Sequence, residues 1–252
     1  MNLIGNIGPG VKLVWSAIKY RKGIPRIRAA RERGDYEEER QAIADITSEW
    51  LDYLIKAYDM HYEIVGRENI PEGPCVFIAN HQAYCDIIGF IAATRGKQVG
   101  FIAKEEFRKT PLMGQWITDM RGLFIHRGNS RDSLKTIQEG VELLKQGFSL
   151  VIFPEGKRSC GPGLDEFKAG SFKLATRAKV PVVPVTIDGT YHMFEDHNDT
   201  ITPGQSAKLT IHPPIPTADM SRAEQAELPD QVREIIRNAL PGKGEGYIRV
   251  FD

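Results

Sequence analysis

A histidine and an aspartate with four residues between them, His81 and Asp86, follow the apolar run 75–79 (CVFIA). Such a pair can act as a hydrogen-bonded dyad in which the imidazole is a general base. On a continuous helix the two side chains would point about 140° apart. The dyad therefore requires His81 in the turn after a strand and Asp86 near the start of the next helix. The alternative is that Asp86 caps a helix and His81 lies on the surface.

Two more charged motifs also include or follow apolar runs. Residues 122–127 (GLFIHR) end in Arg127, whose guanidinium fork can bind phosphate oxygens bidentately. Residues 153–159 (FPEGKRS) contain a tight Pro-Glu-Gly turn, in which Gly156 lets a ligand approach the backbone. The structural alternatives are a buried strand that ends in solvent and a solvated loop.

Short β-type runs alternate with helical patterns after residue 66, which predicts an α/β domain with a mainly parallel or mixed sheet flanked by helices. Strands are expected at 61–65, 75–79, 99–103, 122–126, 149–153, 182–187 and 207–212. Helices are expected at 86–94, 111–119, 131–146, 166–178 and 221–239. Ligand sites in such sheets lie beyond the carboxyl ends of the strands, which is where the charged motifs fall. The run 180–185 (VPVVPV) is predicted to be an edge or ligand-lining strand, because proline cannot donate to a ladder.

The first 59 residues have a different, helical pattern. One apolar helix face is formed by residues at the spacing i, i+3, i+4, i+7, namely Val11, Val14, Trp15 and Ile18. Pro25 should kink or end this helix. A second helix over 36–59 carries an apolar stripe of Ile43, Ile46, Trp50, Leu54 and Tyr58. The chain is therefore divided into a two-helix hairpin at 1–59 and a catalytic domain at 60–252.

The formal net charge of zero is an average over two opposed segments. Residues 1–33 carry eight Lys or Arg and one acid, whereas residues 34–59 carry eight acids and two bases. A basic amphipathic helix with a tryptophan suits the surface of an anionic membrane. The alternative is that the basic helix packs against the acidic one.

Other features of the composition limit the partners and the compartment. Zero net charge gives no reason to expect a nucleic-acid partner. Three cysteines without C-x-x-C spacing suit a reducing cytosol, and the first residues lack the basic region of a secretory signal. We expect a peripheral protein on the cytoplasmic face of the cell membrane.

In their order, the motifs resemble the conserved boxes of the glycerophospholipid acyltransferase family, specifically its 1-acylglycerol-3-phosphate (lysophosphatidate) acyltransferases. The resemblance covers about residues 61–215. The N-H-x4-D, G-x-F-I-x-R, F-P-E-G-T-R-S and V-P-V-x-P-V boxes match residues 80–86, 122–127, 153–159 and 180–185. Lys157 departs from the third box by replacing its threonine. Lys104 stands where the family usually has a lysine between the first two boxes.

The resemblance implies transfer of a fatty acyl chain from acyl-CoA or an acyl carrier protein to 1-acylglycerol 3-phosphate, giving phosphatidic acid. His81 would be the general base and Asp86 would orient it, with no metal and no cofactor beyond the acyl thioester. The substrate-binding residues would be Lys104, Gly122, Arg127, Glu155, Gly156 and Arg158. Another lysophospholipid or glycerol 3-phosphate is an alternative acceptor.

Three other hypotheses stay open at this point. Cys85 could form an acyl-thioenzyme, although a free cysteine is more often buried filler. The run 192–197 (HMFEDH) could bind a metal in a metal-dependent hydrolase, although it matches no H-E-x-x-H zinc helix. The protein could also be a membrane-docking scaffold without activity.

Overall fold

The computed structural model describes residues 7–126, 130–246 and 248 and contains one seven-stranded sheet. The strand order is β1-β7-β6-β2-β5-β3-β4. β1 and β7 run parallel to each other and antiparallel to the other five. The strands are β1 (His61–Val65), β2 (Val76–Ala79), β3 (Val99–Lys104), β4 (Leu123–Ile125), β5 (Ser149–Ile152), β6 (Val182–Asp188) and β7 (Ser206–Ile211).

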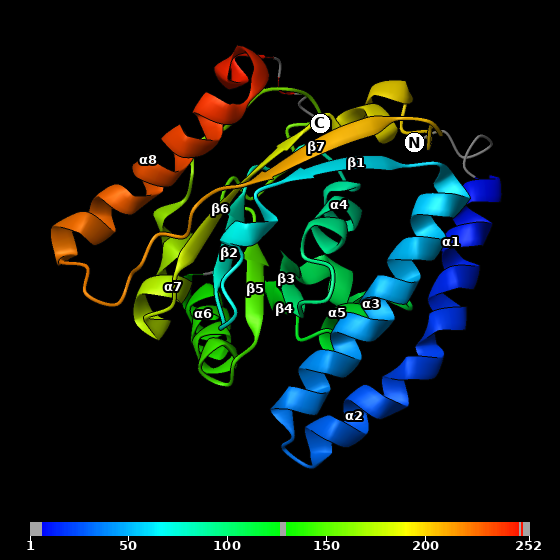
Figure 1. The fold of residues 1–252 in the computed structure, drawn as a ribbon, viewed down its shortest axis with the longest axis horizontal. Helices are drawn as coiled ribbons and strands as arrows, with labels where there is room; N and C mark the ends of the chain where they lie inside the picture. Colours follow the sequence, from blue (N-terminus) through cyan, green and yellow to red (C-terminus); the bar gives the residue numbers. More distant parts are fainter. Residues whose placement is uncertain (1–6, 127–129, 247, 249–252) are drawn as a thin grey trace.

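Helices cover both faces of this sheet (Figure 1). On one face, α6, α7 and α8 pack against the strands, and on the other α4 does so, with α3 lying over α4. The helices of this part are α4 (Asp86–Ala93), α5 (Met113–Asp119), α6 (Ser130–Lys145), α7 (Lys173–Ala178) and α8 (Arg222–Ala239).

The central strands are apolar along their whole length because both faces of the sheet are covered. Every residue of β2 and β5 is buried. Alternate residues of β2 enter the two apolar clusters on opposite faces: Ile78 packs with the α6 side, and Phe77 packs with α4. The position of the sheet edge that carries the charged motifs is therefore fixed by packing on both sides.

All seven predicted strands are confirmed, with ends shifted by at most one residue. The interpretation of 180–185 as an edge strand is wrong, because β6 lies between β2 and β7. Pro184 is tolerated there because the antiparallel ladder with β7 begins only at the next residue, Val185. On its other side Pro184 is paired with Ile78 of β2.

The N-terminal hairpin has a bent first arm. It consists of α1 (Ile7–Tyr20), a 3-10 turn (Arg21–Gly23) and α2 (Ile24–Glu32), followed by α3 (Tyr36–Tyr58) as the second arm. The break comes before Pro25, which occupies the first turn of α2, where its missing N–H costs nothing. Asp35 caps α3 by accepting a hydrogen bond from the N–H of Glu38.

The hairpin ends with α3 at Tyr58 and the α/β part begins with β1 at His61. The two parts nevertheless share one hydrophobic core. Ile27 of α2 and Ile43 of α3 belong to the same buried cluster as Leu150 of β5. A buried carboxylate adds a polar contact: Glu39 accepts from Arg31 at 2.7 Å and from Nε and Nη2 of Arg121, each at 2.7 Å. Glu39 therefore ties both arms of the hairpin to the segment before β4.

The apolar face of α1 is not part of the core. Six of its apolar side chains are exposed, at 37–64% of their area: Ile7, Val11, Leu13, Val14, Trp15 and Ile18. The opposite side of α1 holds it on α3, because Trp50 donates to the hydroxyl of Ser16 and Tyr58 donates to the carbonyl of Pro9. No helix in the described part of the chain is long and apolar enough to cross a bilayer.

We predict that Glu39→Ala destabilises the protein by about 3–5 kcal/mol, because two partly buried guanidinium groups would lose their carboxylate. Urea unfolding followed by circular dichroism measures this free energy. The matched control is Glu37→Ala on the same helix, where an 82% exposed carboxylate pairs with Arg40. That change should cost less than about 1 kcal/mol. Equal losses for the two variants would show that Glu39 does not hold the hairpin in place.

Candidate active site

Polar side chains from several strands converge at the carboxyl edge of the parallel part of the sheet. His81 follows β2, Glu155 follows β5, and Thr190 follows β6, whereas Lys104 is the last residue of β3. Because the carboxyl ends of parallel strands meet at one edge, residues distant in the sequence come together there.

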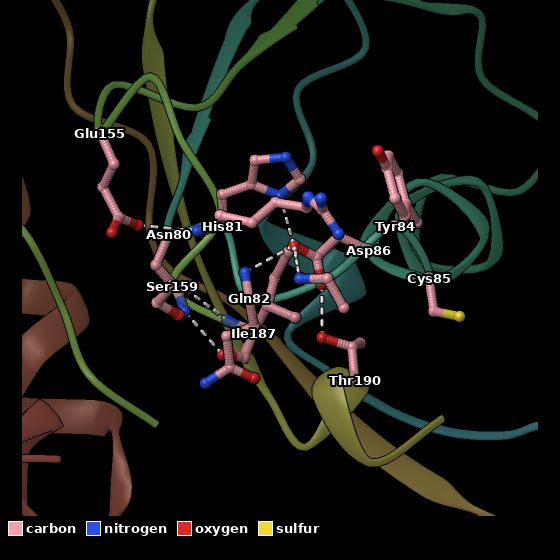
Figure 2. A network of polar contacts seen from close by, with 12 residues as sticks. Asn80, His81, Gln82, Tyr84, Cys85, Asp86, Glu155, Ser159, Ile187 and Thr190 are labelled. Carbon is pink, nitrogen blue, oxygen red and sulfur yellow. Dashed lines mark hydrogen bonds and ion pairs between the residues drawn. The ribbon is translucent and has the colours of Figure 1, made fainter. Parts of the chain in front are cut away.

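His81 and Asp86 have the arrangement that a dyad requires. Asp86 is the first residue of α4, and His81 lies in the turn before it. His81 Nδ1 lies 2.6 Å from Asp86 Oδ2 (Figure 2). The Asp86 side chain is fully buried, whereas that of His81 is 16% exposed. The imidazole therefore has one nitrogen bound to a buried carboxylate.

Four donors surround the Asp86 carboxylate. Besides His81, the backbone N–H groups of Gln82 and Ala83 donate to Oδ2, at 2.7 and 3.0 Å. The Thr190 hydroxyl donates to Oδ1. The turn thus wraps around the carboxylate of Asp86, and Thr190, which follows β6, binds that carboxylate from the other side. These contacts fix the position of Asp86 and, through it, that of the imidazole.

The His81 ring is also held by an aromatic contact. It stacks on Phe153 with centroids 4.1 Å apart and an interplanar angle of 15°. In Figure 2 the second ring nitrogen, Nε2, points away from Asp86. Nε2 is therefore the atom that can take a proton from a bound molecule.

The FPEG turn is bound to the His81 turn through backbone groups. Glu155 accepts from the N–H of His81 at 2.7 Å and from the N–H of Asp165 at 3.1 Å. Ser159 N–H donates to the carbonyl of His81 at 2.8 Å, and Cys160 N–H donates to that of Gln82 at 3.0 Å. Burial raises the pKa of Glu155 to about 8, although the two N–H donors act in the opposite direction.

Arg158 is held by two groups. Its Nη1 donates to Glu195 Oε1 at 2.6 Å, and its guanidinium carbon lies 3.6 Å from the centre of the Tyr84 ring. Glu195 is fully buried and also accepts from the N–H of Tyr84 at 3.0 Å. Burial raises the pKa of Glu195 to about 7, against the effects of the Tyr84 N–H and Arg158.

The other cations near this edge differ in their partners. Lys104 pairs with Glu106 at 3.1 Å, and Lys157 pairs with Asp165 at 2.7 Å. The lysine that replaces the threonine of the third box therefore supports the loop through Asp165. Lys168 forms no ion pair with the described carboxylates.

Two glycines of the predicted site have different positions. Gly156 lies in the FPEG turn with φ +73°, and an added Cβ would come 2.7 Å from Lys168 Nζ. Gly122 directly precedes β4, at the amino end of that strand. A Cβ at Gly122 would lie 2.7 Å from the carbonyl of Phe101. Gly122 thus permits close packing of β4 on β3, and the structure does not bring it to the site. Arg127 lies outside the described residues.

Cys85 faces away from the reactive edge. Its sulfur points away from His81 in Figure 2, and it packs in a buried cluster with Tyr191 and Met193. Burial, with Glu195 and Asp86 nearby, raises the pKa of its thiol well above the ordinary value. A neutral, buried thiol is a poor nucleophile.

The cluster at 192–197 does not form a set of metal ligands. Glu195 is directed to Arg158 and Tyr84, whereas His192 pairs with Asp196 at 2.9 Å on the surface. Within residues 7–126, 130–246 and 248, no three His, Cys, Asp or Glu side chains are arranged to hold a metal ion. The histidine and the buried glutamate of this run are therefore held by different partners.

Thr190 and Glu195 are site residues that no sequence motif indicated. Both follow the fourth box and reach the His81 turn only because β6 lies beside β2. The one sequence signal was the position of 192–197 just beyond a strand end. The sequence alone does not tell that Glu195 is buried and that its neighbour Asp196 is exposed.

An α/β domain with a His–Asp pair at this edge matches a known family. The Acyltransferase family model matches residues 61–188, about half of the chain. The chain therefore belongs to the acyltransferase family, as the motifs predicted.

Several relatives have a more specific name. A chloroplastic 1-acyl-sn-glycerol-3-phosphate acyltransferase of Brassica napus is 35% identical over 61% of this chain and 44% of its own length. The human 1-acyl-sn-glycerol-3-phosphate acyltransferase alpha is 30% identical over 70% of this chain and 62% of its own. The chain thus spans about half the length of the plant relative that it matches.

A solved structure matches over the whole chain. The 1-acyl-sn-glycerophosphate acyltransferase PlsC from Thermotoga maritima has a TM-score of 0.73 and 28% identity, and the match covers 99% of this chain and 100% of that one. The likeness therefore includes the N-terminal helices as well as the sheet.

We predict that Glu155 makes stability fall as pH rises. Its folded pKa of about 8 exceeds the ordinary value of 4.5, so the folded protein holds an extra proton between these pH values. That contribution is complete below about pH 4.5 and is lost as pH rises through 8, at up to roughly 1.4 kcal/mol per pH unit.

The measurement is urea unfolding at several pH values between about 5 and 9, for wild type and Glu155→Gln. The wild type should lose more stability over this range than Glu155→Gln. The pH dependence that comes from Glu195 is present in both proteins and cancels in the comparison. Parallel curves would contradict a raised pKa at Glu155.

Proposed function

We propose that the protein transfers a fatty acyl chain from an acyl thioester to the free hydroxyl of 1-acylglycerol 3-phosphate, giving phosphatidic acid. The observation that carries this proposal is the His81–Asp86 pair, with Nδ1 and Oδ2 2.6 Å apart and Nε2 directed away from Asp86. The names of the relatives in Brassica napus, human and Thermotoga maritima support the same substrate.

The chemistry is direct transfer. His81 Nε2 removes the proton from the acceptor hydroxyl as its oxygen attacks the thioester carbonyl. The new C–O ester bond forms, the C–S bond breaks, and the proton passes from the imidazolium to the leaving thiolate. Asp86 holds the ring in the tautomer with its proton on Nδ1 and stabilises the imidazolium. The buried, neutral Cys85 thiol favours this route over an acyl-enzyme.

The acceptor phosphate is assigned to the cations around this edge. Two of these cations, Lys104 and Arg158, are among the described residues. Arg127 is the third cation in our proposal. Glu155 and Gly156 shape the same pocket by holding the FPEG turn. The reaction requires no metal or other cofactor, and either acyl-CoA or an acyl carrier protein supplies the thioester. Another lysophospholipid or glycerol 3-phosphate would use the same cations.

We further propose that the protein works as a peripheral protein at the cytoplasmic face of the cell membrane, with α1 as its docking surface. The exposed apolar face of α1 includes Val11, Trp15 and Ile18, at 51–64% exposure. The basic Lys12 and Lys19 are exposed on the same helix. Two acidic side chains of α3, Glu38 and Asp45, bind Arg26 of α2, and Asp52 binds Arg95. Packing of the hairpin therefore leaves α1 available to lipid.

We predict that His81→Ala lowers acyl transfer to 1-acylglycerol 3-phosphate by about 10²–10⁴-fold, because the general base is lost. The assay measures phosphatidic acid formed from a labelled acyl thioester. His192→Ala, at an exposed histidine that pairs with Asp196, is the control and should keep wild-type rates. A wild-type rate in His81→Ala would remove the proposed mechanism.

We predict that Trp15→Glu weakens binding to anionic vesicles without unfolding the protein, because Trp15 is 51% exposed. Co-sedimentation with phosphatidylglycerol vesicles at rising salt measures the binding. Leu134→Glu, which changes a 42% exposed apolar residue on α6, is the matched control and should bind as the wild type does. Equal binding by both variants would place the membrane surface elsewhere.

A further inference from the structure

A buried carboxylate outside the four motifs contacts two of them. Glu195 belongs to the short 3-10 turn Glu195–His197 that follows β6, and its side chain is fully buried. Its Oε1 accepts from Arg158 in the third box and from the backbone N–H of Tyr84 in the first. A buried charge is stable only when it is paired and hydrogen-bonded, so these contacts are specific requirements of the fold.

The two contacts of Arg158 fix the plane of its guanidinium. Glu195 holds one end through Nη1, and the Tyr84 ring lies 3.6 Å beneath the central carbon. Nε and Nη2 make no hydrogen bond with other described residues. An arginine has five N–H donors in a rigid fork, so a group held at one end and on one face still presents donors to an anion.

The backbone ties the segment that carries Arg158 to the turn that carries the reactive histidine. Ser159, the neighbour of Arg158, donates its N–H to the carbonyl of His81 at 2.8 Å. Tyr84 itself lies in the turn between His81 and Asp86. The orientation of Arg158 is therefore set relative to the atom that takes the hydroxyl proton.

We propose that Glu195 is a positioning residue for the acceptor: it holds the Arg158 guanidinium flat against Tyr84 so that the free donors meet the phosphate. This inference rests on the proposed function, because it assigns the phosphate of the lysophospholipid to Arg158. Glu195 touches no substrate in this account and acts only through Arg158. It therefore determines how well a phosphate-bearing acceptor binds, and it has no part in the proton transfer.

The second contact of Glu195 defines a competing role. Through the N–H of Tyr84, Glu195 could instead support the turn that carries the dyad. A change at Glu195 would then lower kcat for every acceptor and would do so whether or not Arg158 is present. The two roles therefore differ in the kinetic parameter that changes and in the dependence on Arg158.

The test is steady-state acyl transfer by the full chain carrying Glu195→Gln, a change that keeps the size and removes the charge. The KM for 1-acylglycerol 3-phosphate should rise about tenfold, because the ion pair is replaced by a weaker hydrogen bond to a neutral amide and Arg158 loses its fixed orientation. The KM for the acyl thioester and kcat should change by less than about twofold. Asp196→Asn, at the exposed neighbouring carboxylate that pairs with His192, should leave all three values unchanged.

A coupling experiment decides between the two roles. Adding Glu195→Gln to Arg158→Met should cause no further rise in the acceptor KM, because the residue through which Glu195 acts is already gone. Additive effects in the double variant, a loss confined to kcat, or an unchanged or lower acceptor KM in Glu195→Gln would each overturn the proposal. A wild-type protein that does not acylate 1-acylglycerol 3-phosphate would instead refute the proposed function.

Discussion

One buried carboxylate, that of Asp86, organises the candidate site. A fully buried charge must be compensated by nearby donors, and here four groups from two segments of the chain donate to it. Two of them are backbone N–H groups of the turn after β2, so the carboxylate determines the shape of that turn. The imidazole of His81 is the third donor and the hydroxyl of Thr190 is the fourth. The position of the proposed base therefore follows from the hydrogen bonds that the buried Asp86 carboxylate requires.

Two further buried carboxylates extend this arrangement outward. Glu155 binds the N–H of His81 and Glu195 binds the N–H of Tyr84, so both ends of the same turn are held by acids from other segments. Burial raises the pKa of each of these acids and Asp86 adds to the rise, so bringing three acids together has an electrostatic cost. Backbone donors and Arg158 offset that cost, which explains why the arginine of the third box is bound to a carboxylate. The phosphate-binding group and the dyad are thus parts of one network.

The sheet and the dyad could be predicted from the sequence because their signals are local. Apolar runs mark the central strands, and the turn after β2 is the only place where His81 and Asp86 can meet. Pairing across the sheet is not a local property, so the sequence predicts an edge or ligand-lining strand at 180–185, whereas β6 lies between β2 and β7. The same reason hides Glu195, because its partners are distant in the sequence. Gly122 was assigned to the substrate site by its box, whereas the structure places it at the amino end of β4, in close contact with β3.

The most direct test of the central claim is the rate of acyl transfer by Asp86→Asn, His81→Ala and the double variant, each checked for an intact fold by circular dichroism. If Asp86 acts by holding His81, Asp86→Asn should lower the rate by about 10²–10⁴-fold. The double variant should then be no slower than His81→Ala alone. A near wild-type rate in Asp86→Asn, or a further large loss in the double variant, would contradict the account.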